Sequence, residues 1–461
     1  MKTNLTTNSQ RILAASTLHR LNGLMWFCAM LGFVMNTEAQ TPVCGNISGT
    51  WTPAGNPYII ACDSTVPSGQ TLTIQPGVVV WLGSNVTLAA NGLIQAVGTP
   101  SQRIKFQSPV SSQYWNSISL IHQSGTNRFN YCDFVNGDTA ISMGVYGANA
   151  TMIAEVMNCT FSNCISGAIY GVSQGTTFPI GSATLDPIIK NCVFESLSNA
   201  CVMRIIQDGF GFRGYANPKI IGNVFRNLTG SAFLMVTESD GSSQPIFLNN
   251  TLINCRTGVA SQEPWDAKVQ SCIFVGCSNA VMRSGSLSTA ASYNNFFANA
   301  TNFTGYPGTY GVPIIVNRNG TASDLLFNIF QDPLFVGAND YHLTASSTCI
   351  DAGVGDPANF DSCFPPSLGS VTNDIGAYGG PGGCEWISPP ATNIFTVAIA
   401  QYVGVTLNPP TNGHYRLEYA SVLSGTNNWI QLTNLTLSAP FIYYDPVVSG
   451  SRFYRGVLLG P

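Results

Sequence analysis

The sequence predicts an all-β protein in which a parallel β-helix solenoid is followed by a small antiparallel β-sandwich. Three observations support this fold class. A short motif centred on Phe or Leu recurs seven times, at spacings of 22 to 33 residues. Helical 3.6-residue periodicity is missing, and short β-branched or aromatic runs are separated instead by Gly, Asn and Ser, which is typical of strands and turns. After residue 383 the repeat ends and a different alternation begins.

The composition indicates a chain that folds around a large core. Of the 461 residues, 45% are hydrophobic and only 9% are charged, the reverse of a disordered chain. The net charge is −4 and no run of basic residues is present, so a nucleic-acid partner is not expected.

Residues 1–39 are predicted to be a secretory signal peptide that is cleaved near Ala39. Three basic residues precede the apolar run Leu21–Met35, and small residues follow it. The run is shorter than the roughly 18 apolar residues of a membrane span, so none is expected in the mature chain. We therefore expect a secreted, cell-surface or periplasmic protein, in which disulfides can form. Of the 14 cysteines, Cys28 lies in the signal, and the remaining odd number predicts at least one unpaired or intermolecular thiol.

The repeat lies within residues 40–383, the predicted β-helix with an N-terminal cap and a C-terminal closing segment. Its clearest copy is "NCTFSNCISGAI", from Asn158 to Ile169. The central residues of the copies, here called the anchors, are Phe134, Phe161, Phe194, Phe225, Leu252, Phe274 and Phe296. The shortest spacing suits one turn of three short strands at roughly 3.3 Å per residue, and longer spacings indicate rungs with inserted loops.

Equivalent positions of the copies carry similar residues, which predicts that like side chains stack on like. Two residues before the anchor stand Cys132, Cys159, Cys192 and Cys272. Three residues after it stand Cys164, Leu197, Leu228, Cys255 and Cys277. Two residues after it stand Asn136, Asn163, Asn227 and Asn254. Cysteine exchanging with leucine behaves as a small apolar core residue, and the asparagines suit an asparagine ladder at a turn.

A metal site is the alternative interpretation of the cysteines. Such a site usually includes histidine, and His122, His342 and His414 all lie outside the clearest copies. We therefore expect a structural stack and no metal. Oxidation of a stacked pair such as Cys159 with Cys192 is left open but not favoured.

The repeat resembles the right-handed parallel β-helix proteins of the pectate-lyase-like superfamily. The resemblance extends upstream through Ser48–Ser108, with "VPSGQTLTIQPGVVV", and downstream to "DPLFVGANDYHLTASSTCIDAG" and "NDIGAYGGPGG", which resemble the closing segment of such proteins. It covers about 340 residues and implies the fold. It does not imply an activity, because the superfamily spans many functions.

The familiar catalytic patterns of polysaccharide hydrolases and lyases are missing from the sequence. Clustered aspartates with Gly-His-Gly and Arg-x-Lys are not found, and neither is an acidic calcium site beside a catalytic base. Whether the chain is an enzyme is therefore left uncertain.

In the long copies the inserted residues follow the Ala-Ile position and precede the anchor strand of the next copy. Insertions at the same place in successive copies are predicted to stack as loops in one ridge along the solenoid. The ridge gathers carboxylates, aromatics and basic groups that suit sugar binding. Its candidate binding residues are Arg204, Asp208, Arg213, Tyr215, Glu238, Asp240, Glu263, Trp265, Asp266 and Lys268, with Asp186 beside them. An ordinary polar loop edge is the alternative for any one of these residues.

Near the end of the repeat, Asp351, Asp356, Asp361 and Asp374 raise the question of calcium. Their spacing is not that of a calcium loop, so turn or cap roles are expected. No cofactor is predicted. Calcium binding is left open, although no calcium-binding motif indicates it. Two disulfides are hypothesised, Cys44 with Cys62 and Cys363 with Cys384.

Residues 384–461 are predicted to form the small β-sandwich. A Pro-rich joint, "ISPPATN", is followed by short alternating strands. This part resembles the immunoglobulin- or fibronectin-like modules that end many exported bacterial proteins.

Three functions are compatible with the sequence. The first is a secreted β-helix protein, expected to be a monomer, that binds polysaccharide or a cell-surface glycan along a loop-decorated face. The second is a polysaccharide lyase or glycoside hydrolase with a non-standard active site. The third is a purely structural or adhesive solenoid.

Overall fold

The computed structural model describes most of the chain after residue 39. The described ranges are 40–121, 125–178, 180–207, 211–237, 243–261, 267–283, 290–386, 402–408, 412–420, 429–446 and 452–460. The predicted signal peptide lies outside them. The chain divides into two compact units, Met1–Pro389 and Pro390–Pro461. In the described part, no helix is long and apolar enough to cross a bilayer.

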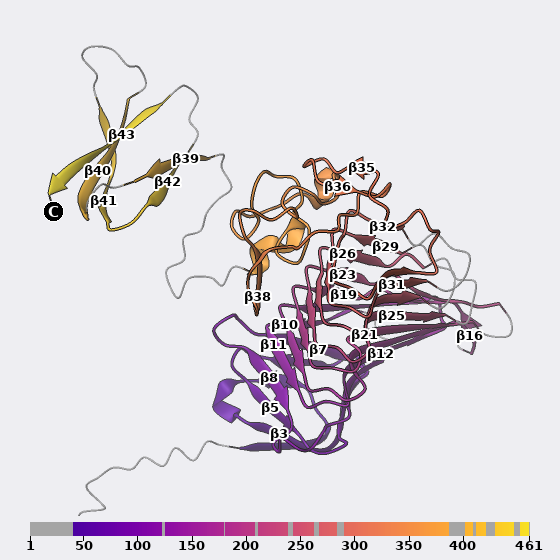
Figure 1. The fold of residues 1–461 in the computed structure, drawn as a ribbon. Coiled ribbons are helices and arrows are strands. Elements are labelled where there is room, and N and C mark those ends of the chain that lie inside the picture. Colours follow the sequence, from indigo (N-terminus) through magenta and orange to yellow (C-terminus); the bar gives the residue numbers. More distant parts are fainter. Residues whose placement is uncertain are drawn as a thin grey trace, which may run out of the picture. The chain divides into compact units, whose positions relative to one another are not determined.

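The first unit is all-β, as predicted, and is built from parallel strands stacked in long sheets (Figure 1). Successive turns of the chain lie one above another in a nearly closed, solenoid-like stack, so that each turn forms one rung. A 20-stranded sheet forms two rows joined by β3 (Tyr58–Val66), which pairs with β5 in one row and β6 in the other, and with β1 (Thr41–Asn46). A 12-stranded sheet forms the third side.

The first row, here called the anchor row, contains the anchor residues. Its strands are β5 (Val79–Leu82), β8 (Ile104–Gln107), β11 (Cys132–Val135), β14 (Thr160–Ser162), β20 (Val193–Glu195), β24 (Val224–Arg226), β27 (Thr251–Ile253), β30 (Ile273–Val275) and β33 (Asn295–Phe297). The second row consists of β6 (Thr87–Ala90), β9 (Ser117–Ile121), β12 (Thr139–Tyr146), β15 (Gly167–Gln174), β21 (Cys201–Ile206), β25 (Ser231–Thr237), β28 (Thr257–Ser261), β31 (Asn279–Arg283) and β34 (Thr301–Thr304).

The 12-stranded sheet completes each rung. It consists of β2 (Gly49–Trp51), β4 (Thr71–Ile74), β7 (Leu93–Val97), β10 (Thr126–Asn130), β13 (Ala150–Met157), β19 (Ile188–Lys190), β23 (Lys219–Ile221), β26 (Ile246–Leu248), β29 (Lys268–Gln270) and β32 (Ala290–Ser292), with β18 (Ala183–Leu185) and β22 (Gly214–Ala216) extending it beside β13. Smaller elements are η1 (Pro53–Gly55), η2 (Pro357–Asn359), η3 (Gly380–Trp386) and the hairpins β16 (Thr176–Thr177) with β17 (Ile180–Gly181), β35 (Ile315–Val316) with β36 (Ala322–Ser323), and β37 (Phe335–Gly337) with β38 (Asp340–Leu343).

Two columns of left-handed residues bend the chain on either side of each anchor strand. The predicted asparagine column two residues after the anchor is confirmed: all four asparagines have φ between 52° and 59°. Asn163 Nδ2 donates to Asn136 Oδ1 at 2.6 Å, so the ladder is bonded from rung to rung. A second column, three residues before the anchor, was not predicted; it includes Tyr131, Asn158 and Asn191. Asparagine tolerates this backbone conformation better than most residues, which explains its recurrence at both corners.

The anchors form an aromatic stack through the core. The rings of Phe134, Phe161, Phe194 and Phe225 lie nearly parallel, with centroids 4.7 to 4.9 Å apart. All four side chains are fully buried. In-register pairing places each ring on the next, because Phe161 lies opposite both Phe134 and Phe194 in the ladder.

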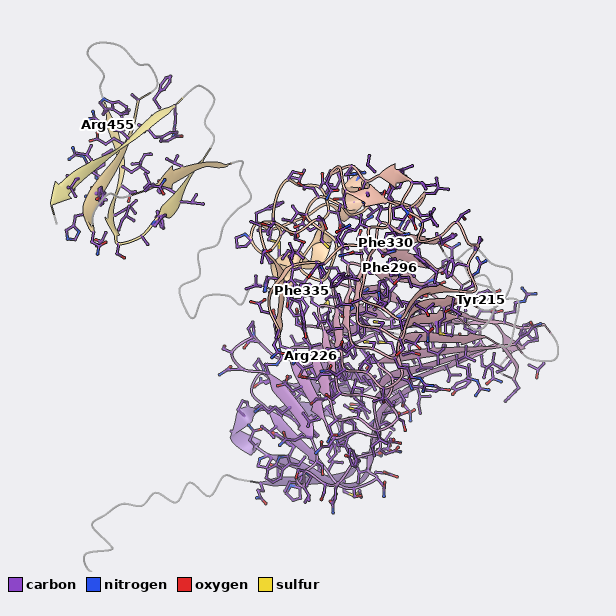
Figure 2. The ribbon with its side chains drawn as sticks, viewed as in Figure 1. Tyr215, Arg226, Phe296, Phe330, Phe335 and Arg455 are labelled. Carbon is purple, nitrogen blue, oxygen red and sulfur yellow. A yellow bond between two sulfur atoms is a disulfide. The ribbon has the colours of Figure 1, made fainter. Side chains whose placement is uncertain are left out.

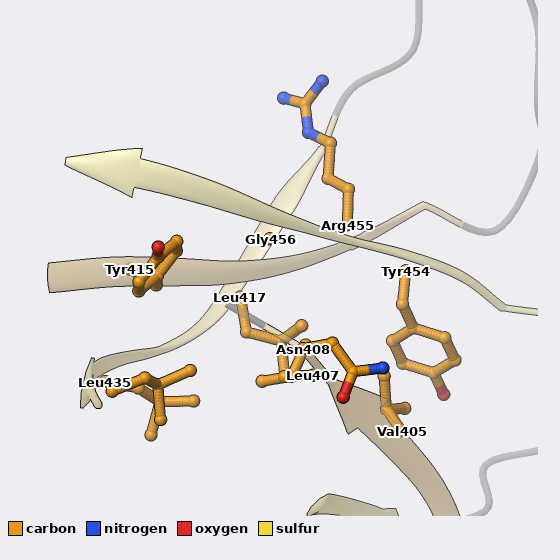
Figure 3. Close-up of a pocket in the computed structure, with 10 residues that line it drawn as sticks. Val405, Leu407, Asn408, Tyr415, Leu417, Leu435, Tyr454, Arg455 and Gly456 are labelled. Atoms are coloured by element: carbon orange, nitrogen blue, oxygen red, sulfur yellow. The ribbon is translucent and has the colours of Figure 1, made fainter. Parts of the chain in front are cut away.

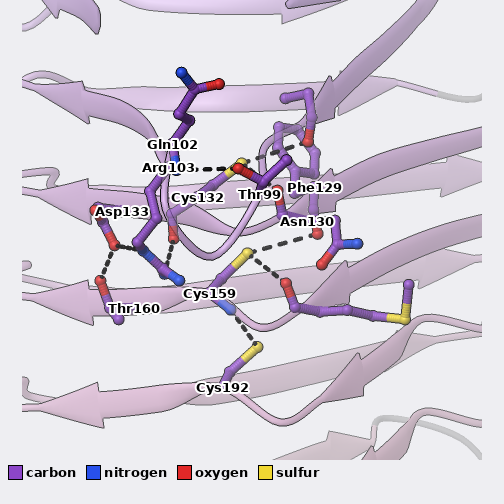
Figure 4. Close-up of polar contacts among 12 residues, drawn as sticks. Thr99, Gln102, Arg103, Phe129, Asn130, Cys132, Asp133, Cys159, Thr160 and Cys192 are labelled. Carbon is purple, nitrogen blue, oxygen red and sulfur yellow. Dashed lines mark hydrogen bonds and ion pairs between the residues drawn. The ribbon is translucent and has the colours of Figure 1, made fainter. Parts of the chain in front are cut away.

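The column two residues before the anchor is a mixed ladder of thiols and amides, of which Figure 4 shows the thiols Cys132, Cys159 and Cys192. Asn223 and Asn250 continue the column of Cys159 and Cys192, and all are buried. Cys192 N donates to Asn223 Oδ1 at 2.8 Å, whereas Cys159 N donates to Cys192 Sγ at 3.4 Å. The same side chains donate to a carbonyl of the preceding rung, as Asn223 Nδ2 does to Ile189 O at 3.0 Å. A thiol and an amide therefore serve the same backbone groups, which the corner leaves without strand partners.

The cysteines of the described residues fall into two disulfides and nine free thiols. Both hypothesised disulfides, Cys44–Cys62 and Cys363–Cys384, are confirmed. The other nine cysteines among the described residues are buried free thiols, so Cys159 and Cys192 are not joined. Burial raises the pKa of Cys192 well above its ordinary value and that of Cys272 to about 12. These thiols are therefore structural.

Residues 332–386, here called the strap, run along the outside of the anchor row (Figure 1, orange). Outward residues Val224 and Ile253 pack with Tyr341 and Ala377 of the strap. Nearer the last rungs, Ile273 packs with Ile375. Polar bonds add to this contact, since Asn249 Nδ2 donates to the carbonyl of Asp374 at 2.8 Å and Ala377 N donates to Thr251 Oγ1 at 2.9 Å.

The aspartates of the strap hold its own turns together, as predicted. Asp374 accepts from the amides of Asp351 and Leu368, at 2.8 and 2.7 Å. Asp361 accepts from the amide of Asp374 at 3.1 Å. Asp356 caps η2 by accepting from Ala358 N. Burial raises the pKa of Asp361 to about 6, and burial together with the neighbouring Asp361 raises that of Asp374 to about 7.

These two raised pKa values predict that the first unit loses stability as the pH rises from about 4 to about 7. In the unfolded chain both carboxyls ionise near their ordinary pKa of 3.8. Between that value and the folded values the folded state binds more protons, so the free energy of unfolding falls with rising pH. Unfolding curves measured across this range should show a smaller slope in Asp374→Asn. The exposed Asp356→Asn is the control and should keep the wild-type slope; an unchanged slope in Asp374→Asn would contradict the assignment.

The second unit contains two small antiparallel sheets. β39 (Tyr402–Leu407) pairs with β42 (Phe441–Pro446). β40 (Gly413–Ala420) pairs with both β41 (Ile430–Leu437) and β43 (Phe453–Gly460). A cavity of about 270 Å³ between them is lined mostly by apolar side chains such as Leu407, Leu417 and Leu435 (Figure 3). This cavity is the apolar interior of the unit.

Candidate functional site

The long insertions all leave the first unit at one corner. Each of them follows a strand of the second row and precedes a strand of the 12-stranded sheet, as β16 and β17 do between β15 and β19. This corner, here called the loop corner, lies beside β16 in Figure 1.

The structure places the predicted site residues as follows. Arg204 lies in β21, Tyr215 in β22 and Lys268 in β29. Arg213 forms an isolated bridge with Gln207, and its amide donates to Ser182 Oγ at 3.3 Å. Asp186 accepts from Asn217 Nδ2 at 3.0 Å. The other candidates, Asp208, Glu238, Asp240, Glu263, Trp265 and Asp266, lie outside the described residues.

Among the described candidates, Arg204 is on a different layer from Tyr215 and Lys268. Each of the three alternates with buried neighbours along its strand and therefore faces outward. However, β21 belongs to the second row, whereas β22 and β29 extend or belong to the 12-stranded side. Figure 2 shows Tyr215 beside the loop corner. Arg204 and Tyr215 therefore face outward from different layers, although β21 and β22 are in contact.

Arg204 lies instead within a flat face of apolar and aromatic side chains, here called the Tyr170 face. The face consists of the outward residues Ser142, Gly144, Tyr146, Tyr170, Val172, Gln174, Val202, Arg204, Ile206, Leu234 and Val236, most of which are apolar or aromatic. In register, Tyr170 lies opposite Val202, and Arg204 lies opposite both Val172 and Val236. A Cβ on Gly144 would lie 2.9 Å from the ring of Tyr146, so that ring lies against the glycine and flattens the edge of the face.

On the anchor row, apolar outward residues lie where another part of the chain covers them. Its outward column is polar at Lys105, Asp133 and Thr160 but apolar at Val224 and Ile273, which the strap covers. Under the strap, Val224 is 2% exposed and Ile273 1%. The Tyr170 face is also mainly apolar, yet its members remain partly exposed and Tyr146 is 41% exposed. An apolar patch left open on a sheet is typical of a binding surface.

The Tyr170 face offers recognition chemistry rather than acid–base chemistry. Of its residues only Arg204 is charged, only Ser142 and Gln174 are otherwise polar besides the tyrosine hydroxyls, and none is a carboxyl. Within the described ranges, no three His, Cys, Asp or Glu side chains are grouped so as to hold a metal ion. The acids with raised pKa values, Asp361 and Asp374, belong to the strap on the anchor row.

A scan against protein-family models and a search of curated proteins found no match to the chain.

Sequence reasoning selected Arg204 but missed the aromatic and aliphatic residues around it. A signal was available in "GAIYGVSQ", where the outward positions hold Tyr170 and Val172 instead of polar residues. Alternation separates inward from outward positions. It does not distinguish an outward face that the chain itself covers from one that stays open.

Proposed function

We propose that this protein is a secreted polysaccharide-binding protein whose ligand lies along the Tyr170 face. We further propose that it is a right-handed parallel β-helix of the pectate-lyase-like kind, carrying an immunoglobulin- or fibronectin-like module at its C-terminal end. One observation supports the binding function above the others: a mainly apolar and aromatic face with one arginine stays partly exposed, while apolar outward residues of the anchor row are covered by the strap.

The chemistry of the face suits an extended sugar chain. Sugar rings present C–H faces that pack on aromatic and aliphatic side chains, and Tyr170 and Tyr146 add hydroxyl groups. The planar guanidinium of Arg204 can donate several hydrogen bonds to sugar oxygens. Neighbouring strands are about 4.8 Å apart, so β12, β15, β21 and β25 provide a repeating platform for a repeating ligand.

We expect Tyr170→Ala and Arg204→Ala each to weaken polysaccharide binding about tenfold, the effect of losing a central contact. The measurement is affinity electrophoresis on a panel of acidic and neutral polysaccharides, with release of unsaturated or reducing ends followed in parallel to detect a lyase or hydrolase. Tyr215→Ala is the matched control, an outward tyrosine on the other layer, and should bind like the wild type. A weakened Tyr215→Ala with unchanged Tyr170→Ala would move the site to the loop corner. No retention on any polysaccharide would overturn the proposal.

A further inference from the structure

The hairpin of β16 and β17 carries an aromatic side chain that the fold does not bury. Phe178 follows Thr177, which pairs with Ile180 across the hairpin, and its side chain is 94% exposed. A ring with so little contact adds almost nothing to the stability of the first unit. Figure 1 shows β16 at the outer end of the second-row strands β12, β21 and β25. The position of this ring therefore has to be judged by its relation to the Tyr170 face.

The chain runs from the Tyr170 face into the hairpin almost without interruption. β15 ends at Gln174 and β16 begins at Thr176, so Gly175 alone separates the two strands. From Tyr170 onward, partly exposed residues alternate with buried ones as far as Gly175. Because side chains of an extended chain alternate between its two sides, the outward series that begins at Tyr170 continues to Phe178. The ring therefore extends the Tyr170 face beyond the edge of the sheet.

Both ends of the hairpin are fixed to neighbouring rungs. Gly175 N donates to the carbonyl of Ile206 at 3.2 Å, and Ser182 N donates to Asn149 Oδ1 at 3.1 Å. A Cβ on Gly175 would lie 2.2 Å from the carbonyl of Phe212, so glycine lets the hairpin lie this close to the next rung. The hairpin is thus bonded to the rung before it and to the rung after it, and its tip is held in place before any ligand arrives.

The aromatic residues of the face follow one another along the strands and not along the solenoid axis. Tyr146 lies opposite Gln174 in the ladder, four residues beyond Tyr170. Phe178 follows after another four residues, so the three aromatic positions are about 13 Å apart along the strand direction, at roughly 3.3 Å per residue. Along the axis, the ladder neighbours of Tyr170 are a serine and a valine. Sugar rings pack on aromatic side chains, so the aromatic residues indicate a ligand parallel to the strands.

We infer that the polysaccharide crosses the solenoid parallel to β15 and that Phe178 packs on a sugar ring beyond the edge of the sheet. This inference rests on the proposed function of the Tyr170 face and adds the direction and length of the site. The row from Tyr170 to Phe178 measures about 26 Å at roughly 3.3 Å per residue, which suits a chain of several sugars and not a single ring. Its other members, Val172, Gln174 and Thr176, carry no charge, so the chain is held along this row by ring packing and hydrogen bonds.

Calorimetric titration of the full chain with cello-, xylo- and galacturono-oligosaccharides of two and six units tests this inference. We expect a six-unit chain to bind about tenfold more tightly than the two-unit chain of the same sugar, because it reaches a further contact. Phe178→Ala should lower the affinity for the six-unit chain about tenfold, the effect of losing one aromatic contact, and leave that for the two-unit chain unchanged. Phe178→Tyr keeps the ring and should keep most of the affinity.

The matched control is Ile180→Ala, which removes the other exposed apolar side chain of the same hairpin. Ile180 is 66% exposed and lies opposite Thr177, hence on the other side of the hairpin from Phe178, and its loss should leave binding unchanged. An equal loss in Ile180→Ala would overturn the inference, as would six-unit chains that bind no more tightly than two-unit ones.

Two results separate this inference from the proposed function on which it rests. If Tyr170→Ala weakens binding but a folded Phe178→Ala binds six-unit chains like the wild type, the ligand does not reach the hairpin and the inference alone is overturned. If the wild type binds neither the oligosaccharides nor any polysaccharide, the proposed function is overturned together with it.

Discussion

Phe161→Ala is expected to lower the free energy of unfolding of the first unit by about 3–5 kcal/mol, the usual cost of removing a buried aromatic ring. The ring is fully buried and stacks on Phe134 and Phe194, with centroids 4.7 and 4.9 Å away. The rungs above and below are joined by their backbone ladders and cannot close the gap. Denaturant unfolding of the full chain measures the effect.

Two variants make the Phe161 result specific. Phe161→Leu should cost less than about 1.5 kcal/mol, because leucine keeps most of the volume and Leu252 already occupies one position of this column. Phe178→Ala removes a phenylalanine that is 94% exposed and should change stability by no more than about 0.5 kcal/mol. If Phe161→Ala were as mild as Phe178→Ala, the aromatic stack would not be the main source of stability.

Removing the Cys363–Cys384 disulfide by double substitution to serine is expected to destabilise the strap by about 3 kcal/mol. The two cysteines are 21 residues apart, and a loop of about this length gives that value in the chain-entropy account. Limited proteolysis should then cut residues 363–384 faster, while the rungs themselves stay protected. The measurement pairs thermal unfolding with identification of the first cleavage sites.

The matched comparison is the Cys44–Cys62 disulfide, whose cysteines are 18 residues apart near the first rungs. Its removal should cost a similar free energy but should leave cleavage of the strap unchanged. Equal exposure of the strap in both double variants would show that the Cys363–Cys384 bridge has no local role.

The sequence was sufficient for features that repeat along the chain. The spacing of the anchors predicted the rungs, and Asn136 and its counterparts predicted a turn with an asparagine ladder. The left-handed backbone of that turn was not predicted. Both disulfides were also hypothesised, because each pair of cysteines frames a loop that a disulfide could close. The rungs and the asparagine column recur several times in the sequence, and each disulfide closes a short loop between two cysteines that are close in the sequence.

Features made by segments far apart in the sequence could not be predicted in the same way. The ladder joining Cys192 to Asn223 mixes two residue types, so the cysteines were interpreted as apolar core residues instead of hydrogen-bonding groups. The strap brings residues such as Trp386 beside Gly222, and no local pattern indicates that contact. The Tyr170 face was missed for the same reason, because its exposure depends on where the strap lies.

The lengthwise course of the strap also bears on how the first unit comes apart. A solenoid held only by nearest-neighbour contacts frays from its ends, one rung at a time. Here Asn249, Asn191 and Gly222 belong to successive copies, and all of them bond the strap. Peeling the last rungs must therefore also release contacts several rungs away. When the first unit is pulled from its C-terminal side, we expect it to unfold in one large step and not in a series of small steps, one for each rung.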